Sequence, residues 1–332
     1  MKSYNRDTDR YITSRALELF ATGNYSEAEM ADIITEETGI NVSRNVVHGR
    51  VYRHKTTSGL EEKPRTILPY FTKYEHYIRG TVPPVAKVDY DVSSGPLKIL
   101  VLNDLHTPFQ HEEAVEAALV ANKSPDIVVT SEVTDMYSVT SFAKYQHVSF
   151  EQEVEEIIRW FEYLSENYPL IIAIGGGHER RLPKYVLSRI KSDMLFLVET
   201  DILKVLARPF GNIIVTTNPW YQINDALFTH IDKHSATIPM RSADKVHAWV
   251  QAWRPHLEDI SDYSILVQAH SHHSGIINLP DVQLVETGCL QRIPEWVMYR
   301  TPMLPWTHGW CVVYQNDGVT DLNATQLLVY RE

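Results

Sequence analysis

The chain has 332 residues, of which 44% are hydrophobic and 22% are charged, as in globular proteins long enough for one large and one small domain. It has no apolar run of the roughly 18 residues that a membrane helix requires, and its polar N-terminus excludes a secretory signal, so we expect a cytoplasmic protein that contacts no membrane. Its two cysteines, Cys289 and Cys311, have no CxxC spacing, and we expect both to be small buried side chains.

Charge is distributed unevenly along the chain. Residues 1–65 carry 10 basic and 10 acidic side chains, whereas the remainder carries 21 against 32 and accounts for the whole net charge of −11. An acidic body does not attract nucleic acid through its overall field, although metal ions bound among its carboxylates would change the field locally.

Residues 1–57 are predicted to form a helix-turn-helix domain. Apolar residues at helical spacing predict a first helix over residues 7–22, and a capping box at Ser26 opens a second helix that ends at Gly39. Ser43 caps a third helix, from Arg44 to about residue 54. The residues expected on the buried face of the first helix are Tyr11, Ile12, Ala16, Leu17 and Phe20.

The third predicted helix is basic. No acid occurs between Glu37 and Glu61, and four Lys and Arg residues lie in that interval, which suits contacts to phosphates and to a DNA groove. Residues 42–53 (VSRNVVHGRVYR) also resemble the recognition helix of GcrA-type cell-cycle regulators. The alternative is a protein-binding three-helix module with a solvated basic face. The candidate DNA-contacting residues are Arg44, Asn45, His48, Arg50 and Arg53.

Residues 58–96 contain several Pro and Gly residues without a sustained period, and they are predicted to form a linker. From residue 97 to the C-terminus, apolar strands first alternate with helices and then follow one another with less helix between them. Expected strands cover 98–102, 126–130, 170–174, 213–217, 226–230, 265–270, 283–286, 310–314 and 326–330, and expected helices cover 112–121 and 150–167. This pattern favours an α/β fold, a four-layer α/β/β/α sandwich.

Five of these segments end in acids or histidines. They are Asp104-Leu105-His106, Glu132-Val133-Thr134-Asp135, Gly177-His178-Glu179, Thr229-His230 and His270-Ser271-His272. In such sheets, binding sites lie beyond the carboxyl ends of the strands, so we expect these side chains to converge there. Carboxylate and imidazole groups are common metal ligands, so the segments indicate a metal site.

The order of these motifs resembles that of the calcineurin-like metallophosphoesterases, most closely a phage and prophage branch. The matching segments are residues 104–109 (DLHTPF), 135–138 (DMYS), 177–181 (GHERR), His230 followed by residues 233–235 (KHS), residues 270–272 (HSH) and residues 286–290 (ETGCL). The resemblance extends from about residue 97 to 314.

The resemblance implies two divalent metal ions, with Mn favoured and Fe or Zn as alternatives. Asp104, His106 and His272 would hold one ion, His230 and His270 would hold the other, and Glu132 would bridge them. The ions would act on a phosphoester substrate.

The resemblance also implies catalytic and substrate-binding residues. His178 would stabilise the transition state or give a proton to the leaving oxygen, and Asp135 would assist it, although Asp135 also fits a turn or a helix cap. Arg180 or Arg181 would contact a phosphate oxygen, unless each forms a surface ion pair.

Departures from the family pattern fall on metal-ligating positions. The family's Gly-Asp bridge is Ser131-Glu132 here, and Gly177 stands where the family has an asparagine ligand. Ile231 and Ala269 also replace glycines next to the second ion. We therefore expect one firmly bound ion and a weakened second site.

Two functional hypotheses follow. The first is a metal-dependent phosphoesterase, more specifically a phosphodiesterase or nuclease that the N-terminal module targets to DNA. The second is a catalytically degenerate relative that acts as a DNA-binding regulator or scaffold. A phosphomonoesterase remains a third option, because metal ligands do not encode the substrate.

Overall fold

The computed structural model describes residues 6–44, 46–47, 50–51, 91–144, 146–191, 199–216, 218–234, 237–257, 259–293 and 306–331. The chain divides into two compact units, residues 1–75 and 76–332, which are described separately below.

Two helices of the N-terminal unit match the predicted ones, except that the first begins one residue earlier than predicted. Helix α1 covers Arg6–Thr22, and α2 covers Glu27–Thr38. Ser26 and Glu29 form the capping box of α2, since each side chain accepts a hydrogen bond from the other residue's backbone N–H. Gly39 ends α2 with φ of 66°, a left-handed conformation that costs glycine little.

The buried face of α1 differs from the prediction. Tyr11 and Phe20 are exposed, whereas Leu19 is buried. The Tyr11 hydroxyl donates a hydrogen bond to Glu37 on α2, so this ring lies at the rim of the interface between the helices instead of in its core. Buried apolar residues of this unit are Ile12, Ala16, Leu19, Met30, Ala31, Ile34, Val42, Val47 and Val51.

The third predicted helix is described only in part. Arg44, residues 46–47 and residues 50–51 are helical, and Val47 and Val51 are buried. Asn45, His48 and Arg53 lie outside the described residues, as does most of the predicted linker.

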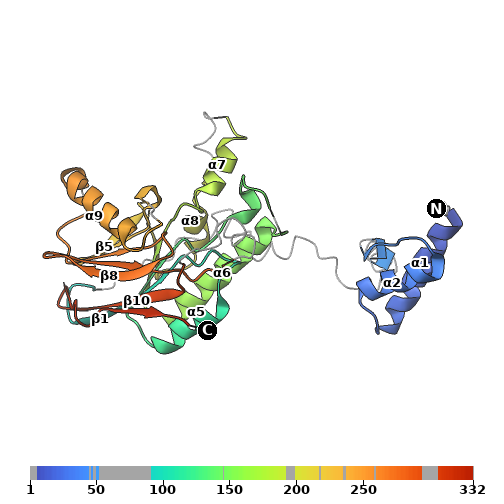
Figure 1. The fold of residues 1–332 in the computed structure, drawn as a ribbon, viewed down its shortest axis with the longest axis horizontal. Coiled ribbons are helices and arrows are strands. Elements are labelled where there is room, and N and C mark those ends of the chain that lie inside the picture. The colour runs from blue at the N-terminus through green and yellow to red at the C-terminus, as the bar shows by residue number, and fades with distance from the viewer. Residues whose placement is uncertain are drawn as a thin grey trace. The chain divides into compact units, whose positions relative to one another are not determined.

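The second unit contains two β-sheets (Figure 1). In the first sheet, four parallel strands lie side by side, and β10 pairs antiparallel with the first of them. These strands are β1 (Pro96–Asn103), β2 (Ile127–Ser131), β3 (Leu170–Ile174), β4 (Ile213–Val215) and β10 (Gly309–Asn316), and the short strands β11 (Val319–Thr320) and β12 (Gln326–Val329) pair with β10.

The second sheet has five strands in the order β5-β6-β7-β9-β8, with β6, β7 and β9 parallel and the two edge strands antiparallel. Its strands are β5 (Trp220–Ile223), β6 (Ala226–Thr229), β7 (Ile265–Gln268), β8 (Ser274–Asn278) and β9 (Gln283–Thr287). In the second sheet the parallel strands are the central ones, whereas in the first sheet the parallel strand β4 forms an edge.

Alternating side chains bury both faces of these sheets. Val101, Val129 and Ile172 of the first sheet share one apolar cluster with Phe228 and Val267 of the second, so the two sheets pack face to face. On the second sheet the intervening residues Leu227, Leu266 and Leu284 instead pack against α9 (Arg241–Trp253).

Helices cover the outer faces and complete the four layers (Figure 1). Helices α5 (Glu112–Ala121), α6 (Phe150–Asn167) and α8 (Ile202–Ala207) lie along the first sheet. A short helix, α7 (Arg181–Leu187), buries none of its residues. The expected α/β/β/α sandwich is therefore present. No helix in the described part of the chain is long and apolar enough to span a membrane.

Several buried elements agree with the prediction, although helix α8, which buries four of its six residues, was not predicted. Three predicted elements have the same first and last residues in the structure: the helices over residues 112–121 and 150–167, and the strand over residues 170–174. Strands β5 and β8 were not predicted: β5 has one buried residue and β8 has none, so neither carries a strong apolar pattern. Cys289 and Cys311 are free and buried, as expected.

Candidate metal centre

The five polar segments meet at one edge of the sandwich. Each follows the carboxyl end of a parallel strand: β1, β2 and β3 in the first sheet, and β6 and β7 in the second. The face-to-face packing of the sheets therefore brings together side chains that are up to 168 positions apart in the sequence.

Three groups of potential ligands lie at this edge. In each group, one ligand atom per residue lies within 4.8 Å of the others. The first group is Asp104, His106, Glu132 and His272, the second is Glu132, His230 and His270, and the third is His106, Asp135 and His178.

Glu132 connects the first two groups. Its Oε1 accepts a hydrogen bond of 2.8 Å from the backbone N–H of His178. Its Oε2 lies 3.3 Å from Nε2 of His106 and 3.2 Å from Nε2 of His230. One carboxylate oxygen thus faces an imidazole of each group, which is the position that a bridging ligand occupies.

The glutamate at this position fits because a glycine lies beside it, in the loop after the neighbouring strand. A Cβ on Gly176 would lie 2.7 Å from Oε1 and 2.9 Å from Cβ of Glu132, closer than such atoms approach. Gly176 follows β3, next to β2, and leaves room for the extra methylene of Glu132. The sequence showed Glu132 as a departure, but it did not show that Gly176 accommodates it.

The backbone at these ligands adopts an uncommon conformation. Five of the six predicted ligands have positive φ, between 45° and 72°, which costs a non-glycine residue about 1–3 kcal/mol. These residues are Asp104, His106, Glu132, His270 and His272. Such conformations persist only where the surrounding structure enforces them, and they are concentrated at functional sites.

The carboxylates are buried and held in their charged form. Asp104 and Glu132 are 0% and 1% exposed. Burial favours their neutral form, but the histidines around them outweigh it, so the pKa of Asp104 is lowered and that of Glu132 lies well below its usual value.

The same interactions raise the pKa values of two histidines. Burial opposes the charged form of His106, but Glu132 and Asp135 outweigh it and raise its pKa to about 10. Burial likewise opposes the charge of His230, and Glu132 and Asp104 raise its pKa to about 9. In contrast, burial lowers the pKa of His270 to about 4. Without a metal ion, protons on His106 and His230 compensate the buried negative charge.

Hydrogen bonds to the other ring nitrogen orient both of these imidazoles. Ser131 Oγ donates to Asn103 and lies 2.9 Å from Nδ1 of His230, so it is placed to accept the Nδ1 proton. Nδ1 of His106 lies 2.9 Å from Nδ1 of His178 and 3.3 Å from Asp135 Oδ2, so both of these side chains hold the ring of His106 in place. In each ring the Nε2 atom then faces Glu132 and is available as a metal ligand.

These observations fit divalent metal ions. Nε2 of His230 is buried and makes no hydrogen bond, Glu132 Oε2 is 3.2 Å away, and the donors are nitrogen and oxygen atoms without a thiolate. Such a donor set suits Mn, Fe or Zn.

His178 lies beside the cluster and is partly accessible, with 26% of its side chain exposed. Its Nδ1 is 3.2 Å from Asp135 Oδ2, and its Nε2 is 2.8 Å from a guanidinium nitrogen of Arg181. Because guanidinium is only a donor, Nε2 accepts and the proton lies on Nδ1. Burial lowers the pKa of His178, in agreement with this neutral form.

The two predicted phosphate-binding arginines are paired with acids. Arg181 donates at 2.6 Å to both the backbone oxygen and Oδ1 of Asp135, and Arg180 donates at 3.0 Å to Oδ2 of Asp232. Their contact with substrate remains a prediction.

Two further buried acids hold the loops of the site, and the sequence did not assign them a role. Glu179 accepts hydrogen bonds from the backbone N–H groups of Thr134 and Gly176, which joins the loops after β2 and β3, and burial raises its pKa to about 7. The carboxylate of Glu286 accepts a hydrogen bond from the hydroxyl of Ser271, the residue between His270 and His272. Both acids lie in segments that carry the family resemblance, residues 177–181 and 286–290, but only the structure shows which backbone and side-chain groups they hold.

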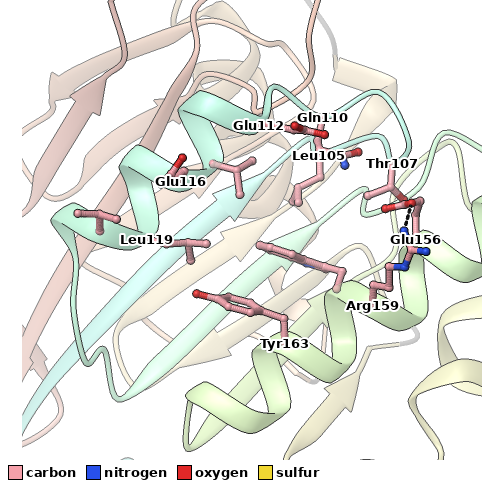
Figure 2. A pocket seen from close by; sticks show the side chains of 12 residues that line it. Leu105, Thr107, Gln110, Glu112, Glu116, Leu119, Glu156, Arg159 and Tyr163 are labelled. Carbon is pink, nitrogen blue, oxygen red and sulfur yellow. Dashed lines mark hydrogen bonds and ion pairs between the residues drawn. The ribbon is translucent and has the colours of Figure 1, made fainter.

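A pocket of about 590 Å³ lies elsewhere, between α5 and α6 (Figure 2). Its wall includes Leu105 and Trp160 but none of the candidate metal ligands. The metal centre is therefore separate from this pocket.

No protein-family model and no curated protein sequence matches the chain. Similar solved structures include an archaeal phosphodiesterase (14% identity, 70% of this chain and 100% of that one, TM-score 0.35). A second is a predicted phosphoesterase of Streptococcus pneumoniae (8% identity, 71% of this chain and 98% of that one, TM-score 0.30). A third is the Zn²⁺ complex of Vps29 from Entamoeba histolytica (8% identity, 70% of this chain and 98% of that one, TM-score 0.35). At these values the likeness assigns no ligand or activity to this chain.

The hydrogen bond between Ser131 and His230 gives a first prediction. Ser131→Ala removes the acceptor that orients His230, and the loss of such a partner typically weakens metal affinity 10- to 100-fold. Isothermal titration calorimetry of the metal-stripped protein with Mn²⁺ measures the change in affinity. Thr130→Val is the matched control on the same strand, because the buried Thr130 Oγ1 has no hydrogen-bond partner among the described residues. Equal affinities for the two variants would contradict the role of Ser131.

The pKa values of about 10 for His106 and about 9 for His230 give a second prediction. Both histidines are protonated at pH 7 without metal and must lose the Nε2 proton to bind an ion, so binding releases protons. The apparent affinity should therefore rise between pH 7 and pH 9, by up to about tenfold per pH unit for each proton released. Calorimetry in two buffers of different ionisation enthalpy counts these protons, and identical heats in both buffers would refute the prediction.

Proposed function

We propose that the second unit is a metal-dependent phosphoesterase. The observation that carries this proposal is the position of Glu132, whose Oε2 lies between His106 and His230 and so joins two groups of ligands. Two divalent ions held a few Å apart would clamp a phosphate group and supply a nucleophile from water at neutral pH.

His178 and Asp135 would handle the proton of the leaving group. Nε2 of His178, the ring nitrogen away from Asp135, accepts a hydrogen bond from Arg181, and it would face a substrate oxygen once the guanidinium group turns to the phosphate. The Asp135 carboxylate would stabilise the imidazolium form while this nitrogen carries a proton. Arg181, which contacts both residues, would hold this pair in place and present a guanidinium group to a phosphate oxygen.

We further propose a phosphodiester of nucleic acid as the substrate, with the N-terminal unit as the DNA-binding module. Support comes from the basic third segment, in which Arg44 begins the helical residues and has a side chain 72% exposed. Arg44 is 3.7 Å from Glu27, an exposed pair that a phosphate can replace at little cost. DNA is thus the proposed partner and Mn²⁺ the proposed metal.

Turnover of bis-p-nitrophenyl phosphate and of labelled DNA with Mn²⁺ tests the catalytic proposal. His178→Ala should lower kcat about 10²- to 10⁴-fold while the number of bound ions stays the same, because general acid–base catalysis contributes that much. Asp104→Asn should lower both metal binding and turnover. His147→Ala, which changes an exposed histidine, is the control. Metal binding without turnover in the parent protein would instead favour a degenerate DNA-binding scaffold.

Binding of the full chain to duplex DNA tests the N-terminal module. Arg44→Ala should weaken binding similarly for all sequences, if it contacts a phosphate, and should reduce the slope of log affinity against log salt by about 1. Fluorescence anisotropy over a series of salt concentrations measures both effects. The control is Arg241→Ala, an exposed arginine of the second unit. An unchanged slope would exclude a phosphate contact by Arg44.

A further inference from the structure

The second group of ligands has an additional carboxylate next to it. A Cβ on Gly177 would lie 3.3 Å from Oδ2 of Asp232 and 3.5 Å from Oε1 of Glu132. The two carboxylates therefore border the same small space, the one that a side chain at position 177 would enter. Asp232 lies two residues after His230, in the 3-10 helix η3 (Asp232–His234), which follows strand β6 of the second sheet.

The ligand group beside this space is short of donors. Among the described residues, only Glu132, His230 and His270 combine there, whereas the first group has four members. His230 is fully buried, and among the described residues its Nε2 makes no hydrogen bond of good geometry, although it faces Oε2 of Glu132 at 3.2 Å and Oδ1 of Asp104 at 3.9 Å. A cation bound between this nitrogen and the carboxylates would satisfy these buried groups together.

Asp232 is free to change its partner. Its side chain is 36% exposed, and its Oδ2 accepts from Arg180, whose side chain is 43% exposed. Ion pairs between such accessible groups contribute little to stability, so turning the carboxylate away from Arg180 costs little.

We propose that Asp232 is a ligand of the second metal ion and replaces the side chain that Gly177 lacks. This inference rests on the proposed metal centre and changes the expectation of a weakened second site. With Asp232, the second ion has two carboxylates and two imidazoles, the same composition as the first group. Rotation of Asp232 toward the ion also releases Arg180, whose guanidinium group then becomes available to a phosphate oxygen.

The experiment counts bound ions and does not depend on activity. The metal-stripped full chain is titrated with Mn²⁺ alone, and free Mn²⁺ is measured by electron paramagnetic resonance. The parent protein should bind two ions, whereas Asp232→Ala should bind one, or bind the second at least tenfold more weakly. Asp232→Asn, which keeps one oxygen donor, should give an intermediate affinity.

A compensating variant separates ligation from a structural effect. In the Asp232→Ala background, Gly177→Asn supplies an amide oxygen to the same space and should restore the second ion. Asp262→Ala, which also removes an exposed aspartate from an ion pair with an arginine, should leave both ions bound. Arg180→Met removes the present partner of Asp232 and should leave the second ion bound at least as tightly, whereas loss of that ion would show that Asp232 acts only through the ion pair.

Two results would overturn the inference. If the parent and Asp232→Ala bind two ions with equal affinity, or if both bind only one, Asp232 is not a ligand, although the first metal site and the proposed function stand. Absence of any bound Mn²⁺ in the parent would instead refute the metal centre itself. The thermal unfolding temperature of each variant shows whether the protein remains folded. We expect it to, because the side chain of Asp232 is 36% exposed.

Discussion

Several carboxyl groups are buried at the strand ends of the second unit, and their negative charge needs compensation inside the protein. Asp104 and Glu132 belong to one group of candidate ligands, Asp135 and Glu132 face the two ring nitrogens of His106 at 3.3 Å each, and all three acids are almost inaccessible to water. Charges in such a place are costly unless they are paired or bind a cation. Histidine protons can meet this need, and so can divalent ions, which compete for the same nitrogen atoms.

The surrounding structure is organised to keep these groups in place. Ser131 orients His230 from β2, Asp135 orients His106 and His178, and Glu179 joins the two loops that carry them. Backbone N–H groups of three candidate ligands with positive φ are also hydrogen-bonded: Asp104 donates to Ser131, His106 donates to Glu132, and His270 donates to the carboxylate of Asp104. Because the ligands come from both sheets, the integrity of the sandwich and the geometry of the site depend on each other.

The departures from the family pattern have structural counterparts in neighbouring residues. The longer Glu132 is matched by the missing side chain of Gly176, and Ser131, where the pattern has glycine, contributes a hydroxyl that contacts His230. Asp232 lies where a side chain at Gly177 would extend. Each substitution therefore has a partner across a strand or a sheet, which a comparison of single positions cannot show.

The sequence by itself predicted most of the well-buried strands and the second N-terminal helix, and it named the candidate ligands. Helix α2 has its capping box and its terminal glycine within the segment itself, and β1, β2 and β3 are continuous apolar runs, so local patterns sufficed. The ligands could be named because each one directly follows such a strand, in an order that resembles a known family. Exposed edge strands such as β8 have no comparable pattern.

Only the tertiary structure decided how these residues meet. Three features depend on residues that are distant in sequence: the exposed position of Tyr11 beside Glu37, the pairing of Arg180 with Asp232, and the fit of Glu132 against Gly176. The charge state of His106 likewise depends on burial and on acids from another strand. Local sequence fixes the periodicity and the ends of an element, whereas contacts, burial and electrostatic interactions arise only when separate elements pack together.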